Sequence, residues 1–199
     1  MQESREHILT TTLQLFLRNS YKEVTMSELV KESGLSKGAF YHYFSSKEQL
    51  FEEVINHFYG SLMQVDYSRY AHDSLQAFYH DYLAGIQQRM DRYPALVRGE
   101  VALQANQYQL LFDALKRLPA FREMRARRQG MELAEWATVV REARAAGEIR
   151  TNLSDMQVAK LFVYLSDGVA VSLMLQNQTD ELLLEMNSAF ASLYQQLTP

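Results

Sequence analysis

Residues 25–50 of the chain read TMSELVKESGLSKGAFYHYFSSKEQL and carry the most specific structural signals in the sequence. Thr25 stands three residues before a glutamate, a capping-box pattern in which the hydroxyl accepts from an early helical amide and the carboxylate reaches back. Gly34 is suited to end the helix that follows, because glycine adopts the left-handed backbone conformation. Ser36 is placed to cap a very short helix over residues 37–43. The stretch therefore predicts two short helices joined by a tight turn.

Helical patterns continue on both sides of this stretch. Upstream, residues 3–19 place their apolar side chains on one helical stripe. Downstream, Ser46 and Gln49 repeat the capping-box pattern and open a helix that runs through Phe58. Further helices are predicted over residues 74–92, 94–107, 108–118, 120–146, 154–176 and 179–197. We therefore expect an all-α fold of about nine helices.

The composition supports this expectation. Of the 199 residues, 47% are hydrophobic and 22% are charged, as in ordinary globular proteins. With 8 Gly and 3 Pro, the chain has few of the turn residues that strand-rich folds need. The absence of cysteine excludes disulfides and thiolate metal ligands. No apolar run of about 18 residues occurs, so we expect no membrane span and a soluble, cytoplasmic protein.

The helices expected within residues 3–43 have the helix-turn-helix layout, in which the second helix of the motif enters the major groove of DNA. Residues 36–39 give that helix a small-residue N-terminal end and one cation. Tyr41 and His42 follow one turn later and are candidates for contacts with DNA.

Two observations qualify this interpretation. Phe40 and Phe44 are interpreted as core residues and are left out of the contact set. The net charge is −4, but residues 1–50 hold six basic and six acidic side chains, so the acidity lies outside this segment. A contact with DNA is therefore compatible with the acidic chain, provided that a few well-placed groups supply it.

The stretch resembles the DNA-binding signature of the tetracycline-repressor (TetR) family of bacterial transcriptional regulators. The resemblance is carried by Thr25, Gly34, Ser36-Lys37-Gly38, the aromatic block from Phe40 to Phe44, and Ser46-Lys47-Glu48 with Leu50. It is specific over about the first 55 residues and architectural beyond them. It implies a helix-turn-helix DNA-binding domain over residues 1–46 and a helical ligand-binding and dimerisation domain over residues 47–199.

The resemblance also implies roles for single residues. Thr25, with Ser27 near by, and Lys47 at a helix N-terminus are expected at phosphates. Lys37 and Ala39 are expected nearest the bases. For Tyr43, the last residue of the short helix, a place at the edge of the core and a contact with a phosphate are equal alternatives. The full set of expected DNA contacts is Thr25, Ser27, Ser36, Lys37, Gly38, Ala39, Tyr41, His42, Tyr43 and Lys47.

The last two predicted helices carry residues in heptad register. These are Leu161, Leu165, Gly168, Ser172 and Leu175 in one helix, and Leu183, Met186, Phe190, Leu193 and Leu197 in the other. An intrachain core is the alternative use of the same pattern. The resemblance implies a four-helix bundle between two subunits, formed by these residues other than Leu175 and Leu197. We expect a twofold-symmetric homodimer whose recognition helices lie about 34–36 Å apart.

The middle of the chain is rich in tyrosine, with six of the 12 tyrosines within residues 59–93. Tyrosine combines apolar area with a polar handle, as ligand pockets require, although ordinary aromatic core is the alternative for any single residue. The resemblance implies a pocket for an aromatic or amphipathic small molecule. Its expected lining is Phe78, Tyr82, Arg89, Tyr108 and Trp136. The basic stretch over residues 116–128 is interpreted as a solvated helix face, with an anion site or a second DNA site as the alternative.

An enzyme is not expected, because dinucleotide-binding, P-loop, nucleophile-elbow and zinc-protease patterns are absent from the sequence. Nor is any cofactor or metal expected. We expect a transcriptional repressor that binds a palindromic double-stranded DNA operator as a homodimer and is released by a small-molecule effector. Two alternatives stay open: a helical protein-interaction module without DNA binding, and an activator of the same fold.

Overall fold

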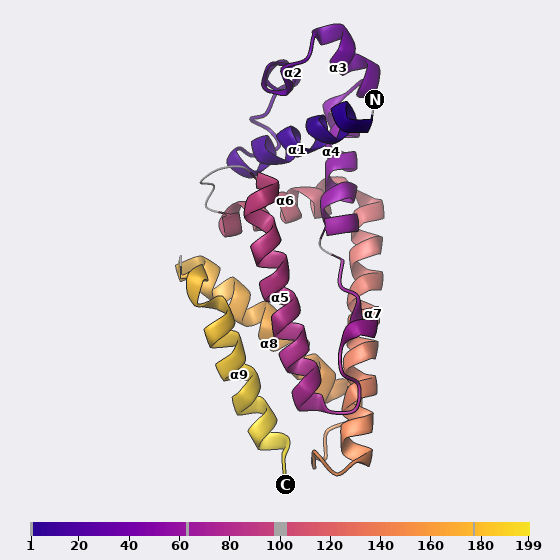
Figure 1. Cartoon of the computed structure of the whole chain (residues 1–199), viewed down its shortest axis with the longest axis vertical. Helices are drawn as coiled ribbons and strands as arrows, with labels where there is room; N and C mark the ends of the chain where they lie inside the picture. The colour runs from indigo at the N-terminus through magenta and orange to yellow at the C-terminus, as the bar shows by residue number, and fades with distance from the viewer. Residues whose placement is uncertain (1, 63, 98–102, 177) are drawn as a thin grey trace. The chain divides into compact units, whose positions relative to one another are not determined.

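The computed structural model describes residues 2–62, 64–97, 103–176 and 178–199, and the regular elements within them are all helical (Figure 1). The α-helices are α1 (Gln2–Arg18), α2 (Met26–Ser33), α3 (Lys37–Tyr43), α4 (Lys47–His57), α5 (Leu75–Val97), α6 (Leu103–Arg117), α7 (Pro119–Ala145), α8 (Asp155–Gln176) and α9 (Leu182–Leu197). Short turns of other helix types are η1 (Phe58–Leu62), η2 (Tyr67–Arg69) and η3 (Thr179–Glu181). The predicted all-α class is confirmed.

The main difference from the predicted elements lies at Pro94. The proline was expected to end one helix and begin another, but α5 continues through it to Val97. Of the two helices predicted over residues 94–107 and 108–118, residues 98–102 lie outside the described part of the chain, and residues 103–117 form the single helix α6. A proline removes one hydrogen bond from a helix and marks a boundary only as a tendency, so a long helix can continue through it.

By its internal contacts the chain divides into two compact units. The first consists of residues 1–64 and 89–123, and the second of residues 65–88 and 124–199. The boundary predicted after residue 46 therefore falls inside the first unit. The reason is that α4 packs against α1 and so joins the helix-turn-helix.

The core of the first unit is aromatic. Phe16 of α1 and Phe51 of α4 meet edge to face with ring centroids 5.1 Å apart. Tyr21 packs against both rings, at 5.8 Å from the first and 4.7 Å from the second. Phe40 and Phe44, at the end of the helix-turn-helix, are completely buried. Because Phe16 and Phe51 come from separate helices, their burial together with Tyr21 holds α1 and α4 together.

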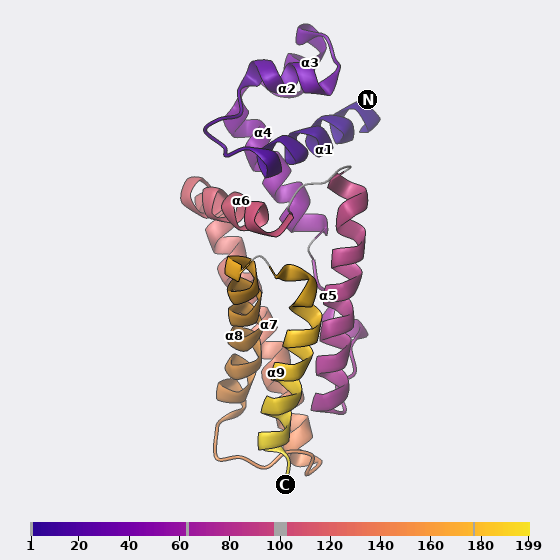
Figure 2. The ribbon, with the colours of Figure 1, turned by 90° about the vertical axis from the view of Figure 1, so that its left-hand side faces the viewer.

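The core of the second unit is built around Trp136 of α7. Its ring stacks on Phe162 of α8, with centroids 4.9 Å apart, and meets Phe78 of α5 edge to face at 4.8 Å. The ring of Phe190 of α9 also contacts Trp136, with ring centroids 5.8 Å apart. Helices α8 and α9 lie side by side (Figure 2). By length and composition alone α8 could also cross a membrane, a test that core helices of soluble proteins pass as well.

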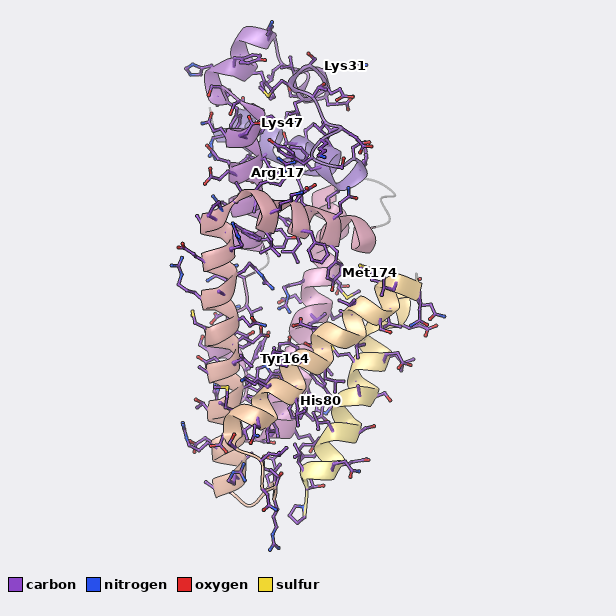
Figure 3. All side chains as sticks on the ribbon, turned by 180° about the vertical axis from the view of Figure 1, so that it is seen from behind. Lys31, Lys47, His80, Arg117, Tyr164 and Met174 are labelled. Carbon is purple, nitrogen blue, oxygen red and sulfur yellow. The ribbon has the colours of Figure 1, made fainter. Side chains whose placement is uncertain are left out.

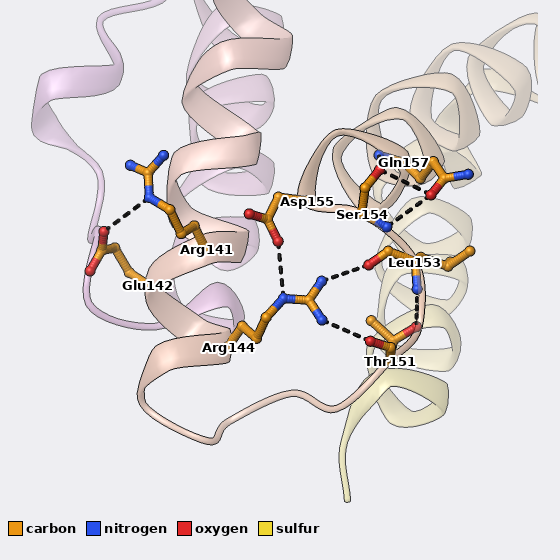
Figure 4. Close-up of polar contacts among 8 residues, drawn as sticks. All are labelled: Arg141, Glu142, Arg144, Thr151, Leu153, Ser154, Asp155 and Gln157. Atoms are coloured by element: carbon orange, nitrogen blue, oxygen red, sulfur yellow. Dashed lines mark hydrogen bonds and ion pairs between the residues drawn. The ribbon is translucent and has the colours of Figure 1, made fainter.

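Arg144, near the end of α7, organises the corner that leads into α8 (Figure 4). Its guanidinium donates to the carbonyls of Thr151 and Leu153, each at 2.7 Å, and to the Asp155 carboxylate at 3.0 Å. Ser154 then caps α8 in a reciprocal pair with Gln157, whose Oε1 accepts from the Ser154 amide at 2.8 Å. This reciprocal pair is a capping box, and it sets where α8 begins.

Glu148 fastens the start of α5 to α9. Its carboxylate accepts from the amides of Leu75 and Gln76 at 2.9 and 3.0 Å, and from the hydroxyls of Ser74 and Tyr194 at 3.0 and 2.9 Å. Burial opposes the charge, but these hydrogen bonds outweigh it and lower the pKa of Glu148. The carboxylate thus supplies partners for amides that a helix start leaves unpaired.

We expect Glu148→Gln to lower the free energy of unfolding by about 1.5–3 kcal/mol at neutral pH, because a charged acceptor is lost. Since the folded pKa lies below the ordinary 4.5, the stabilisation is present above that value and disappears as the pH falls through the lowered pKa. Chemical denaturation over a pH series measures this, with the exposed Glu181→Gln as the matched control. Equal stability of Glu148→Gln and the parent at every pH would contradict this role.

Candidate nucleic-acid interface

The start of α2 is held by a complete capping box. The Thr25 hydroxyl oxygen accepts from the Glu28 amide at 3.3 Å, and the Thr25 amide donates to the Glu28 carboxylate at 2.8 Å. The hydroxyl itself also donates to that carboxylate, at 2.9 Å. Bonds from the Thr25 amide and hydroxyl lower the pKa of Glu28, which therefore stays charged. The predicted cap is confirmed, and the exposed Thr25 side chain is fixed in place.

The turn between α2 and α3 depends on Gly34 and Ser33. Gly34 has a φ of 67° and donates its amide to the carbonyl of Lys31 at 3.2 Å, ending α2 as predicted. The buried Ser33 hydroxyl accepts from the Leu35 amide at 3.3 Å. His7 Nε2 of α1 lies 3.0 Å from the Ser33 carbonyl oxygen. The turn is therefore tied both within itself and to α1.

Burial of Phe40 and Phe44 orients α3. Both side chains have no exposed surface, which confirms that they are core residues and not contacts. Ser36 caps the helix, its hydroxyl accepting from the Ala39 amide at 3.3 Å. The opposite face is open to solvent. Its exposed residues are Ser36, Lys37, Gly38, Ala39, Tyr41 and His42, which we call the α3 face.

The α3 face combines one cation with two aromatic rings. Lys37 Nζ lies 5.9 Å from the centroid of the Tyr41 ring, and 40% of Tyr41 is exposed. The His42 ring meets that of Tyr43, which is partly buried, at 5.5 Å. α3 itself contains no acidic residue. Such a surface attracts an anionic backbone and offers groups that reach base edges.

Lys47 is placed differently from the sequence-based expectation. Its ammonium donates to the carbonyls of Tyr21 at 2.9 Å and Val24 at 2.8 Å, and lies 4.3 Å from the centroid of the Tyr21 ring. Two of its three N–H donors are therefore used inside the first unit. A phosphate contact through the third donor stays a prediction. Ser27, also expected near a phosphate, is exposed.

Tyr21 is the residue that sequence reasoning missed. It joins Lys47 to Arg117 of α6, whose guanidinium carbon lies 3.9 Å from the centroid of the tyrosine ring. Lys47 and Arg117 are labelled in Figure 3. The basic stretch over residues 116–128 is thus not only a solvated face, because Arg117 has a partner within the unit. No spacing rule links residues so far apart in the sequence, so no local signal could have identified this contact.

The residues expected to line a ligand pocket fall into two groups. Phe78, Tyr82 and Trp136 belong to the second unit, where Tyr82 and Trp136 have ring centroids 5.2 Å apart. All three are buried in its aromatic core. Arg89 and Tyr108 belong to the first unit. The structure therefore brings three of the five together, and ligand binding by any of them stays a prediction.

A polar group that the sequence did not indicate lies beside this core. The Tyr82 hydroxyl donates to Glu132 Oε1 at 3.1 Å and lies 3.4 Å from the Ser166 hydroxyl. Burial raises the pKa of Glu132 and of Asp167 above their ordinary values. The indole Nε1 of Trp136 is buried with no hydrogen-bond partner. Within the part of the chain that the structure describes, no cluster of acidic and histidine residues suits a metal ion.

The residues expected at a dimer interface are divided between surface and core. Leu161, Gly168 and Ser172 of α8 are exposed, and Leu165, Leu183 and Leu193 are partly buried. In contrast, Met186 and Phe190 of α9 are 2% and 0% exposed and pack in the core of their own chain, which corrects the prediction at these positions. The same heptad pattern serves an intrachain core, and spacing alone cannot separate the two uses.

One face of α8 remains apolar and uncovered. Its residues follow spacings of three and four and comprise Leu161, Tyr164, Gly168, Val171 and Leu175, which we call the α8 stripe. Leu175 is 78% exposed and Tyr164 51%. Tyr164 is labelled on α8 in Figure 3. A continuous apolar stripe on a helix is the kind of surface that another helix covers.

Known proteins match the chain in its N-terminal part by sequence. Residues 8–54 match the sequence profile described as "Bacterial regulatory proteins, tetR family". Over 59 residues the chain is 42% identical to the HTH-type transcriptional regulator YuxN of Bacillus subtilis. This matched segment is 30% of this chain and 20% of that protein. Over 62 residues it is 39% identical to the HTH-type transcriptional repressor NemR of Escherichia coli, covering 31% of each protein. The matched segment thus spans a third or less of these relatives.

Among solved structures, the crystal structure of the reduced form of Escherichia coli NemR superimposes with a TM-score of 0.61 over 99% of this chain and 100% of that one. The identity is 23%, so this likeness shows the fold. These findings and the geometry above define an all-helical fold with a helix-turn-helix in the N-terminal part of the described residues. Residues 8–54 thus resemble the N-terminal domain of the tetR family, and the two relatives matched over this segment are a transcriptional regulator and a transcriptional repressor.

We expect Gly34→Ala to destabilise the protein by about 1–2 kcal/mol, because a side chain disfavours the left-handed conformation. Gly130→Ala is the matched control, since it lies inside α7 with an ordinary φ and should stabilise by about 0.5–1 kcal/mol. Neither new Cβ meets an atom within 4 Å, so steric clash does not enter the comparison. Thermal unfolding measures both, and the same sign for the two variants would contradict the assignment of Gly34.

Proposed function

We propose that the protein is a ligand-responsive transcriptional repressor that acts in the cytoplasm. It binds a palindromic double-stranded DNA operator as a homodimer, and a small-molecule effector releases it. The observation that carries this proposal is the α3 face, which is exposed because Phe40 and Phe44 anchor the other side of α3. The match of residues 8–54 to the tetR family supports the assignment to DNA.

The α3 face supplies the base contacts in this proposal. Lys37 stands at its start with Tyr41 beside it, and the small Gly38 and Ala39 let the backbone approach closely. Thr25 and Ser27, both exposed, are placed to contact phosphates at the start of α2. Phosphate contacts make such binding fall with salt, which gives a direct experimental signature.

Selection from a pool of random duplexes identifies the operator, and fluorescence anisotropy at stated salt measures the affinity. We expect Lys37→Ala to weaken operator binding about tenfold or more, the effect of losing one good base contact. The control is Lys22→Ala, which removes an exposed lysine of the same unit outside the α3 face and should leave binding unchanged. An equal affinity of Lys37→Ala and the parent would refute the proposed contact.

The α8 stripe supplies the dimer interface in this proposal. A twofold axis that brings two stripes together covers Leu161 and Leu175 of each chain and lets Gly168 admit the partner's backbone. The recognition helices of such a dimer reach half-sites about 34–36 Å apart. DNA of palindromic sequence then matches the symmetry of the protein.

We expect Leu175→Glu to convert the dimer into monomers at concentrations where the parent is dimeric, because two charges would be buried at the interface. The measurement is light scattering after size exclusion. Met131→Glu is the matched control, since Met131 is an exposed methionine (67%) of α7 in the same unit, outside the α8 stripe. A Leu175→Glu protein that stays dimeric, or a parent protein that is monomeric at every concentration measured, would refute the proposed interface.

The effector is proposed to bind through the second unit. Phe78, Tyr82 and Trp136 supply aromatic side chains in the core of that unit, and the Tyr82–Glu132 pair supplies hydrogen-bonding groups beside them. An aromatic or amphipathic small molecule is the class that such residues accommodate. Effector and DNA then oppose each other because each favours a different state of the dimer.

A further inference from the structure

Tyr21 lies between α1 and α2, and every polar group of this residue is bound by α4 or α6. Its amide donates to Asp113 Oδ2 of α6 at 3.3 Å, and its hydroxyl donates to Glu48 Oε1 of α4 at 2.9 Å. Its carbonyl accepts from Lys47 Nζ of α4 at 2.9 Å. Only 5% of the residue is exposed. A single tyrosine therefore has partners on both helices.

Two cationic side chains also lie over the ring of Tyr21. Lys47 Nζ lies 4.3 Å and the Arg117 guanidinium carbon 3.9 Å from its centroid, both well within the range of cation–π attraction. Asp113 and Arg117 pair with each other at 3.7 Å, one turn apart on α6. We call Tyr21, Lys47, Glu48, Asp113 and Arg117 the Tyr21 clamp.

The Tyr21 clamp also contacts the chain just before α2, the helix that precedes the candidate recognition helix α3. Lys47 Nζ also donates to the carbonyl of Val24 at 2.8 Å, and Val24 directly precedes the N-cap Thr25 of α2. Helix α2 in turn contacts α3. The position of Tyr21 therefore bears on where α2 begins, and through α2 on the α3 face.

We propose that Tyr21 is a positioning residue through which α6 sets the helix-turn-helix for DNA binding. This inference rests on the proposed function and names the route of its regulation. When Asp113 and Arg117 hold Tyr21, Lys47 keeps the start of α2 in its DNA-binding position. A displacement of α6 removes a cation and a carboxylate from Tyr21 together and weakens operator binding without touching DNA.

The test is a double-mutant cycle in operator affinity, measured by fluorescence anisotropy on the selected duplex. Arg117→Met and Tyr21→Leu are each expected to weaken binding about fivefold or more, a typical size of coupling between sites. The double variant is expected to bind the operator no more weakly than the more affected of the two single variants. The reason is that both changes break the same contact, between Tyr21 and Arg117. Arg117→Lys keeps a cation and is expected to restore most of the affinity.

Arg122→Met is the matched control, since Arg122 is exposed at the start of α7 in the same unit and is not a member of the Tyr21 clamp. It should leave the affinity unchanged. The salt dependence separates positioning from direct contact: Arg117→Met is expected to keep the slope of the parent. A slope smaller by about one charge per subunit would show that Arg117 contacts phosphate, and would overturn the proposal.

Two further outcomes also overturn the proposal. One is an operator affinity of Arg117→Met equal to that of the parent. The other is a fold-loss of affinity in the double variant equal to the product of the two single fold-losses. Should Tyr21→Leu fail to fold, Asp113→Asn takes its place in the cycle. Amide hydrogen exchange gives a readout that does not need DNA, with faster exchange in α2 expected for Arg117→Met and unchanged exchange contradicting the clamp. A parent protein that selects no duplex refutes the proposed function, whereas the exchange measurement still decides the clamp.

Discussion

The complete burial of Phe40 and Phe44 is the constraint on which the candidate interface depends. A helix of seven residues has little stability of its own, so its orientation comes from the side chains that it buries. With both rings in the core of the first unit, Lys37 and Tyr41 can only face solvent. The exposed side of α3 is thus a consequence of hydrophobic packing on its other side, and the DNA-binding proposal inherits its geometry from that packing.

The first unit is held together by contacts that join distant parts of the chain. Tyr21 brings together α4 and α6 because its amide, carbonyl, hydroxyl and ring each have a partner on one of them. Lys47 has a place in this arrangement that differs from a free surface cation, since two of its donors are directed at carbonyl groups. The helix-turn-helix is therefore packed into one unit with α4 and α6 and does not stand apart from them.

In the second unit, one kind of sequence pattern has two outcomes. Met186 and Phe190 of α9 fill the core around Trp136, whereas Leu161 and Leu175 of α8 stay exposed. Both helices carry apolar residues at spacings of three and four, which satisfies an intrachain core and a helix-helix interface equally well. Only the rotation of each helix about its own axis decides which residues are covered, and that rotation follows from the packing of the whole unit.

Local signals in the sequence were sufficient for the helices of the N-terminal segment, because a cap or a left-handed glycine acts within three or four residues. The Thr25 cap, the Gly34 turn and the bounds of α3 all follow from such short-range chemistry. The long-range contacts were not accessible in this way. The Tyr21 clamp, the passage of α5 through Pro94 and the burial of α9 depend on which helices meet in space, and no local pattern records that choice. Tertiary packing decided them, since burial of apolar surface is summed over the whole unit and overrides the weaker preferences of any single segment.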